Sequence, residues 1–322
     1  MSGTDTRDDE EQAAILRDSS VGLLRSLDLR PIPAGAAAAG TSTITDVFEA
    51  THQRIPSGRA YGGEVVAQAA EAMTRTVDVD RPIHSLHGYF LRAADVARVT
   101  TWEVERLRDG RTVSSRAVRG HQDGRVVFQG LASFQTLSKG AEHAVPMPAG
   151  IPEPESLPTS AEVLAGTDTR DTAYWSHERS FDMRHWPSPV YVHVADTDTN
   201  EDSDARSSEY QVVWLKAYDR LPDDPRLHRT ASAYLCDYTM LEPALRRHGT
   251  AWADGGVMTA SLDHAMWWHR DARVDEWIAF VQESPAASAG RGTGYGRLYT
   301  RAGELIATVM QEGVLTLPRS GG

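Results

Sequence analysis

The sequence predicts an α+β protein made of two similar modules, each a curled antiparallel sheet wrapped around one long helix. Two observations predict this class. A helical segment followed by a run of strand-like segments occurs twice along the chain. Ser85-Leu86 and Phe134-Gln135 in the first half also match Ser261-Leu262 and Met310-Gln311 in the second, so serine and glutamine stand 50 residues apart in both. Agreement in element order and in spacing indicates an internal duplication.

The first module is expected at residues 21–140, after an acidic segment, 1–20, that is too polar to fold by itself and is expected to be disordered. A short helix with Val21, Leu23, Leu24 and Leu27 on one face comes first, and the small residues Ala34–Gly40 then form a linker. Gly62 and Gly63 begin the long helix, whose apolar face contains Val66, Ala69, Ala70 and Met73. Strands are expected at 83–91, 99–107, 113–118 and 125–135, with tight turns at Asp109-Gly110 and Asp123-Gly124.

A proline-rich linker is predicted at 141–174 and the second module at 175–318. The acidic stretch Asp196–Glu209 is interpreted as a solvated insertion in this module. The second long helix is expected over Ala231–His248, with cationic residues in its last turn and Gly249 as its cap. Four strands follow, at 257–268, 276–283, 292–300 and 304–314.

Composition narrows the classes of protein. The hydrophobic fraction of 40% and the charged fraction of 24% allow a packed core, and no apolar run is long enough to span a bilayer, so stable membrane insertion is not expected. The N-terminal residues lack the apolar segment of a secretion signal. A single cysteine, Cys236, excludes an internal disulfide, and no cysteine or histidine cluster has zinc spacing. We therefore expect a cytoplasmic protein without a metal or another cofactor.

The net charge of −12 argues against binding to nucleic acid, which depends on neutralising phosphates with lysine and arginine. A small anionic ligand can still be bound by a few local arginines. One candidate group is the predicted hairpin that carries Arg106, Arg108, Arg111, Arg116 and Arg119, although a solvated hairpin would look the same. The chain contains no G-x-S-x-G elbow and no glycine-rich nucleotide-binding motif, so a serine-nucleophile α/β-hydrolase or a nucleotide-binding enzyme of those classes is not indicated.

Asp237 is the most informative candidate for chemistry. The apolar face of its helix is formed by Tyr234, Tyr238, Leu241 and Leu245, and Asp237 lies among them. A carboxylate on such a face is at least partly buried, and burial raises its pKa unless donors compensate. An aspartate that only anchors a neighbouring loop would show the same pattern, but buried carboxylates are rare enough to favour a functional role.

Ser261 and Gln311 lie in the strand-like segments that follow. Alternation places Gln311 on the same face as Leu305, Ala307 and Val309, and a buried serine or glutamine is usually a satisfied core group. Three polar groups from three consecutive elements are less ordinary. If they converge, Asp237 could accept a proton from a water that Ser261 and Gln311 orient. Asp263, His264 and His269 also invite an acid–base interpretation, yet a histidine in an aromatic strand is more often structural.

Six segments resemble the type II acyl-CoA thioesterases, the TesB-like family: Tyr61–Ala69, Ile83–Arg92, Val104–Arg111, Ser261–Trp267, Gln282–Pro285 and Val309–Val314. They fall in the family's order, and the resemblance covers nearly the whole chain from about Leu23 to Leu317. It implies a double hotdog fold and hydrolysis of fatty acyl-CoA to free fatty acid and CoA, and so a part in fatty acid metabolism. It also implies the catalytic residues Asp237, Ser261 and Gln311. The acidic segment at the start, the longer linker and Asp196–Glu209 depart from the family pattern.

The expected mechanism is direct attack of an oriented water on the thioester, with Asp237 as the general base. Backbone N–H groups of Gly62 and Gly63, where the first long helix begins, are the candidate oxyanion donors. The position that matches Asp237 in the first half falls near Tyr61–Gly63, where no acid stands. We therefore expect one active centre per chain, with Ser85 and Gln135 as remnants of a silent one.

Two other functions fit the same residues. A hotdog-fold enoyl-CoA hydratase or dehydratase would act on an acyl thioester through an Asp/His pair, and a non-catalytic acyl-CoA binding protein would bind the substrate without releasing CoA. The expected partner in every case is acyl-CoA, and a homo-oligomer, a dimer or tetramer of double hotdogs, is an open expectation. The sequence does not determine which acyl chain is preferred.

Overall fold

The computed structural model of the protein describes residues 22–33, 44–168, 171–192 and 210–317. The acidic segment 1–20, the linker at Ala34–Gly40 and the stretch Asp196–Glu209 lie outside the described residues. Residues 22–27 form the short helix that the leucine spacing predicts, and Leu23 and Leu27 are buried. In the described part of the chain, no helix is both long and apolar enough to cross a membrane.

Most of the structure is one 13-stranded antiparallel sheet. The order in the first half is β1-β2-β4-β5-β6-β3, and in the second half, read from the far edge, β7-β8-β11-β12-β13-β10. The same order of strands thus occurs twice, and the pair β3–β10 joins the two halves. First-half strands are β1 (Arg30–Ile32), β2 (Ile44–Ala50), β3 (Ile83–Phe90), β4 (Thr100–Asp109), β5 (Val113–Gln122) and β6 (Arg125–Gln135).

Second-half strands are β7 (Phe181–Trp186), β8 (Gln211–Ala217), β9 (Met258–Ser261), β10 (Asp263–Trp268), β11 (Ile278–Ser288), β12 (Arg291–Thr300) and β13 (Leu305–Thr316); β9 pairs with β13. Short helices α3 (Ser160–Val163), η2 (Pro154–Ser156) and η3 (Tyr174–Glu178) precede β7. Burial alternates strictly along β5, which is the pattern of a strand with one face in the core. Asp123 and Gly124 adopt positive φ angles of 48° and 71°, which confirms the predicted tight turn between β5 and β6.

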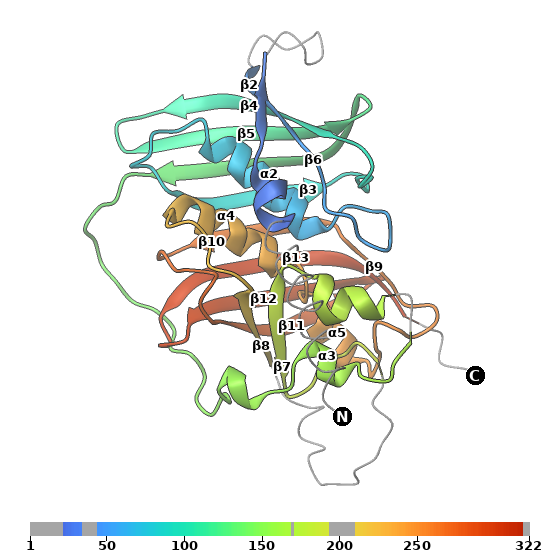
Figure 1. The fold of residues 1–322 in the computed structure, drawn as a ribbon. Coiled ribbons are helices and arrows are strands. Elements are labelled where there is room, and N and C mark those ends of the chain that lie inside the picture. The colour runs from blue at the N-terminus through green and yellow to red at the C-terminus, as the bar shows by residue number, and fades with distance from the viewer. Residues whose placement is uncertain (1–21, 34–43, 169–170, 193–209, 318–322) are drawn as a thin grey trace, which may run out of the picture.

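The two long helices, α2 (Gly62–Thr74) and α4 (Pro225–Cys236), pack side by side in the middle of the molecule, and each is enclosed by the sheet of its own half (Figure 1). Their close approach requires glycine at position 63, because a Cβ atom there would lie 2.1 Å from the carbonyl oxygen of Tyr234. Tyr61 adds a hydrogen bond of 2.8 Å to that same oxygen. This double hotdog confirms the predicted fold class.

The second long helix is shorter than predicted. α4 ends at Cys236, and a separate helix, α5 (Glu242–Arg247), follows, so the expectation of one helix over Ala231–His248 is wrong. Pro243 explains the break, because a proline in that turn has no N–H to continue the helical ladder. The end of α5 does match the prediction, since Arg246 and Arg247 occupy its last turn and Gly249 adopts a φ of 60°.

Two other expectations need correction. The predicted strand 257–268 is broken at Leu262, whose N–H donates to Glu312 and whose carbonyl accepts from Phe90, so Ser261 ends β9 rather than lying inside one long strand. Strands β1, β2, β7 and β8 were not predicted. β8 is buried on both faces, and such a strand shows a continuous apolar run instead of the alternation that identifies a half-buried strand.

Candidate active site

Asp237 is the first residue after α4, so the end of the helix, and not its middle, presents the carboxylate. Its Oδ1 atom accepts two hydrogen bonds, one from Ser261 Oγ at 2.9 Å and one from Gln311 Nε2. Gln311 Nε2 also donates to Ser261 Oγ at 2.9 Å. The structure therefore brings the three predicted residues into mutual contact.

Strand pairing explains why Ser261 and Gln311 meet. β9 and β13 are antiparallel neighbours, and Ser261 lies opposite Gly313, two residues beyond Gln311 on β13. Residues two apart on a strand point to the same face, so the Gln311 side chain reaches Ser261 diagonally across the pair. Gln311 is 1% exposed, in agreement with its predicted apolar face, whereas Ser261 and Asp237 are partly exposed.

His264 forms a hydrogen bond with the side-chain carbonyl oxygen of Gln311. Its Nδ1 atom lies 2.7 Å from Gln311 Oε1, and the imidazole is 1% exposed. Because Gln311 uses its NH2 group on Asp237 and Ser261, its carbonyl oxygen must accept, and His264 must carry the proton on Nδ1. Burial lowers the pKa of His264, which favours this neutral form. The sequence interpretation gave His264 a structural role and missed its contact with the site.

Burial raises the pKa of Asp237, because the charged carboxylate loses solvent. Four neighbours oppose this effect in decreasing order: the Gln311 amide, the electrostatic interaction with the His264 ring, the Ser261 hydroxyl and the backbone N–H of Gly63. The carboxylate is therefore a stronger proton acceptor than an ordinary solvated aspartate, and donors still fix its position. A group with these properties suits general-base chemistry.

The start of α2, in the other half, faces the same carboxylate. Gly63 directs its N–H toward Asp237, and a Cβ atom at Gly62 would lie 2.3 Å from Asp237 Oδ2. The two predicted glycines are thus next to the Asp237 carboxylate, where backbone N–H groups and the helix dipole favour negative charge. The carboxylate comes from one half of the chain and these N–H groups come from the other.

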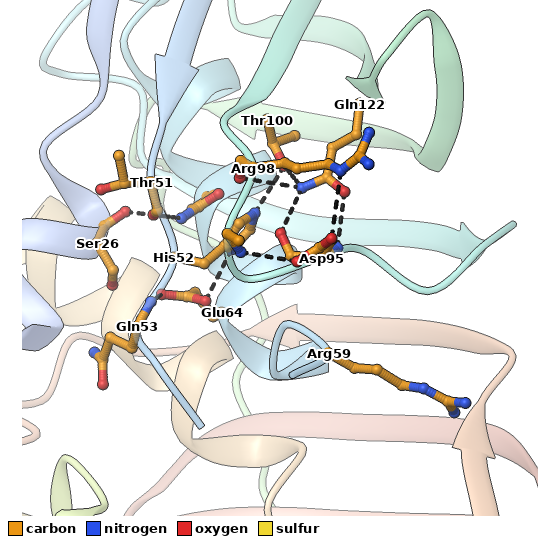
Figure 2. A network of polar contacts seen from close by, with 12 residues as sticks. Ser26, Thr51, His52, Gln53, Arg59, Glu64, Asp95, Arg98, Thr100 and Gln122 are labelled. Carbon is orange, nitrogen blue, oxygen red and sulfur yellow. Dashed lines mark hydrogen bonds and ion pairs between the residues drawn. The ribbon is translucent and has the colours of Figure 1, made fainter. Parts of the chain in front are cut away.

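A buried polar network holds the start of α2 in place (Figure 2). Glu64, in the first turn of α2, accepts hydrogen bonds from the Gln53 N–H at 2.9 Å and meets His52 Nδ1 at 2.9 Å. His52 Nε2 in turn lies 2.7 Å from Thr100 Oγ1, at the start of β4. The side chains of His52 and Glu64 are fully buried. These contacts fix the segment that leads into Gly62 and Gly63.

A cavity of about 540 Å³ opens onto Asp237, Ser261 and Gln311. Both halves contribute to its wall. Residues from the first half include Ile55, Arg59, Phe90 and Arg92, and residues from the second include Tyr174, Trp175, Leu241 and Trp252. The cavity is mainly apolar with a few convergent polar groups, as is usual for small-molecule sites.

Among the described residues of the first half, no equivalent of this site occurs. The residue after α2, in the place that Asp237 has after α4, is Arg75, which bonds to Glu71. The first half therefore has no acid at the position that matches Asp237. That position is Arg75, and the sequence-based placement at Tyr61–Gly63 was wrong, because α5 and the loop after it lengthen only the second half. The serine–glutamine pairs of the two halves also differ in strand register. Ser85 lies opposite Ser133, two residues before Gln135, whereas Ser261 lies opposite Gly313, two residues after Gln311. The equal spacing of 50 residues therefore does not correspond to an equal register.

The other candidates lie away from the cavity. Arg106 forms a two-point ion pair with Asp46, and Arg116 is buried against Asp109 and Thr76. None of the five hairpin arginines lines the cavity at Asp237. Cys236 is fully buried, as predicted for a small apolar side chain. In the part of the chain that the structure describes, no group of three or more metal-binding side chains occurs.

Comparison with known proteins gives a consistent result. Residues 191–314 match the family model described as acyl-CoA thioesterase, and residues 51–135 match the model described as acyl-CoA thioesterase N-terminal domain. The chain is 34% identical to human acyl-coenzyme A thioesterase 8 over 273 residues, which is 84% of each protein. It is 31% identical to acyl-CoA thioesterase 2 of Haemophilus influenzae, covering 84% of this chain and 92% of that one.

A solved structure agrees with these relatives. The crystal structure of the acyl-CoA thioesterase II TesB2 from Mycobacterium marinum superposes with a TM-score of 0.70 at 34% identity, covering 93% of this chain and 99% of that one. The similarity therefore extends over both halves and includes the β3–β10 junction.

Proposed function

The chain belongs to the acyl-CoA thioesterase family and is an acyl-CoA thioesterase, and we propose that it hydrolyses fatty acyl-CoA by direct attack of a water that Asp237 activates. The observation that carries this mechanism is the contact of Asp237 with Ser261 and Gln311 at the wall of a cavity that both halves form. Asp237 Oδ1 already accepts two hydrogen bonds, which leaves Oδ2, beside Gly62, to receive a proton.

In the proposed reaction, the water oxygen bonds to the thioester carbonyl carbon while its proton passes to Asp237. The negative charge that develops on the carbonyl oxygen is stabilised at the start of α2, where Gly62 lines the cavity. Collapse of the tetrahedral intermediate breaks the carbon–sulfur bond, and the proton held by Asp237 passes to the departing CoA sulfur. The products are the free fatty acid and CoA. Ser261 and Gln311 orient the carboxylate and the water.

The direct-attack mechanism excludes an acyl-enzyme, and a single-turnover experiment tests it. Excess enzyme is mixed with acyl-CoA, quenched at intervals, and analysed by intact-protein mass spectrometry together with a free-thiol assay. We expect CoA and fatty acid to form at the same rate and no mass corresponding to an acyl group on Ser261 or Asp237. An acyl adduct that forms and decays at the rate of turnover would overturn the mechanism.

The same assay separates the alternative functions. A hydratase or dehydratase would change enoyl-CoA absorbance without releasing thiol, and a binding protein would retain acyl-CoA unchanged. Thioesterase names on relatives that span both halves favour hydrolysis over either alternative. A series of acyl-CoA lengths in this assay would define the preferred chain. We also propose a cytoplasmic location and a part in fatty acid metabolism; the lone cysteine, a free thiol, is typical of reducing compartments.

The pH dependence of kcat/KM follows from the raised pKa of the Asp237 carboxyl. Because burial raises the pKa of Asp237, kcat/KM should fall on the acid side at a pH above the ordinary aspartate value of about 3.9. The Ser261 hydroxyl lowers this pKa, so Ser261→Ala should move the acid limb to higher pH, while Ser261→Thr, which keeps a hydroxyl, should leave it close to its original position. The measurement is kcat/KM by thiol release from pH 4 to 8. An acid limb that moves to lower pH in Ser261→Ala would contradict the assignment.

His264 is expected to act as a positioning residue. Replacing it with Phe leaves Gln311 Oε1 buried without its donor, and we expect kcat to fall about tenfold with little change in KM. His264→Asn keeps an N–H group near the position of Nδ1 and should recover most of the activity. The measurement is the separate determination of kcat and KM for the two variants. Equal activities of the Phe and Asn variants would show that the hydrogen bond to Gln311 has no effect on turnover.

A further inference from the structure

A second cavity of about 530 Å³ adjoins the catalytic one in the first half of the chain. The two share Arg92, Ala93 and Val127 in their walls, so a single extended ligand could occupy both. The loop after β3 and the turn between β5 and β6 form the second cavity. Its charged lining residues are Arg92, Arg98, Arg125, Asp95 and Asp123.

The arginines around this junction have two different roles. Arg98 forms ion pairs with both Asp95 and Asp123, so its one charge is shared by two carboxylates. The lining has three arginines against these two aspartates, an excess of one positive charge. Arg92 and Arg125 are exposed, and within the described residues neither forms an ion pair with a carboxylate. Arg92 is held by a hydrogen bond of 2.7 Å from Nη1 to the carbonyl oxygen of Val126. The second cavity therefore has an excess of positive charge in a chain of net charge −12.

Arg59 extends this positive region along the catalytic cavity. Its side chain is exposed, lines the cavity that contains Asp237, and points away from the buried network of His52 and Glu64 (Figure 2). The segment around Arg59 is held beside the second cavity by a β-bridge to Asp95. Arg59 and Arg92 thus stand on the path between the catalytic residues and the second cavity.

The part of the catalytic cavity's wall that the second half contributes differs in character. Tyr174, Trp175, Leu241 and Trp252 belong to this part. Arg179 also lies there, but it is only 5% exposed, and its guanidinium packs on the rings of Tyr191 and Tyr238 at 5.1 and 5.2 Å. A buried guanidinium enclosed by aromatic rings is poorly placed to receive the bulky phosphates of a cofactor-sized group. This aromatic part of the wall suits an acyl chain instead.

We propose that the second cavity binds the phosphate groups of CoA through Arg92 and Arg125, with Arg59 beside the path of the pantetheine arm. This inference rests on the proposed function, and it gives the substrate a direction: CoA lies in the first half, the thioester lies at Asp237, and the acyl chain lies along the aromatic part of the wall that the second half contributes. Guanidinium groups suit this task, because their planar fork matches two phosphate oxygens at once. An excess of positive charge at the mouth also steers an anionic substrate inward.

The arginines of the predicted hairpin are not the ones that line this junction. Arg106 and Arg116 of that hairpin already bond to Asp46 and Asp109, and the hairpin arginines line neither cavity. Arg111 is an exposed member of the same hairpin and therefore serves as a matched control for the loss of one surface charge.

The test compares three substrates that carry the same acyl group: acyl-CoA, acyl-3′-dephospho-CoA and acyl-pantetheine. For Arg92→Ala and Arg125→Ala we expect KM for acyl-CoA to rise about tenfold with little change in kcat, because a charge-assisted contact is lost in binding and not in the chemical step. Values for acyl-pantetheine should stay at those of the unaltered enzyme, since that substrate lacks the phosphates. Arg111→Ala should match the unaltered enzyme on all three substrates.

Other outcomes are equally decisive. A rise in KM for acyl-pantetheine equal to that for acyl-CoA would mean that the two arginines support the fold and bind no phosphate. Arg92→Lys keeps the charge but not the planar fork, and it tests independently whether Arg92 binds a phosphate. A tenfold rise in KM in Arg111→Ala would assign the effect to general charge. Unchanged KM in both cavity variants would overturn the proposed subsite. Failure of the unaltered enzyme to release thiol from any of the three thioesters would instead reject the proposed function.

Discussion

Asp237→Asn should lower kcat/KM for acyl-CoA by about 10²–10⁴-fold, the usual contribution of a general base, and should leave the melting temperature close to that of the unaltered protein. The asparagine oxygen can still accept the hydrogen bonds that Ser261 and Gln311 donate to Oδ1. The site would therefore keep its shape and lose only the proton acceptor. Thiol-release kinetics and thermal unfolding, measured on the same preparation, test both expectations.

Asp263→Asn provides the matched control for this prediction. Asp263 is two residues after Ser261, burial raises the pKa of its carboxyl, and its Oδ1 accepts from the Glu312 N–H at 2.7 Å. It does not line the catalytic cavity. An asparagine oxygen can accept the same backbone hydrogen bond, so we expect nearly full activity. Full activity of Asp237→Asn, or an equal loss in both variants, would refute the assignment of Asp237 as the base.

Gly62→Ala should lower kcat/KM about 100-fold with little loss of stability. The added Cβ atom would lie 2.3 Å from Asp237 Oδ2, so the carboxylate must move away from its position. A displacement on the order of 1 Å in a catalytic group is enough to reduce the rate by about that factor. The helix itself gains a residue with better helix propensity, which is why the folded state should survive. The measurements are kcat/KM by thiol release and the urea midpoint of unfolding.

Gly140→Ala is the control for an added methyl group, because a Cβ atom there meets no atom within 4 Å. It should match the unaltered enzyme in both measurements. A Gly62→Ala enzyme with normal kcat/KM would show that the start of α2 can accommodate a side chain beside the base, and the proposed oxyanion position next to Gly62 would then be untenable.

Much of the fold was accessible from the sequence, because local pattern and local turn chemistry agree there. Burial alternates along β5 and along most of β12 and β13, and Asp123-Gly124 supplies the positive φ angles that a tight turn requires. The Gly62-Gly63 start of α2 was equally visible. Gln311 was identified as a polar group on a buried face, and its exposure of 1% agrees.

Other features could not be read from local pattern. β8 gives no alternation because both of its faces are buried. His264 looked like an ordinary aromatic-strand histidine, since only the approach of β13 brings Gln311 within 2.7 Å of its ring. Contacts of this kind depend on register between strands that are distant in sequence, which a single sequence does not encode visibly.

Asp237, Ser261 and Gln311 show which features the sequence determines and which depend on the tertiary structure. The sequence by itself determined that the chain repeats one architecture twice and that three polar side chains of the second half belong on largely apolar surfaces, because periodicity and residue type are local properties. Only the tertiary structure decided that these side chains touch, that the start of α2 from the other half completes the site, and that the first half has Arg75 where the second has Asp237. The physical reason is that hydrogen bonds and buried charge act over a few ångströms, and folding alone brings residues so far apart along the chain to that distance.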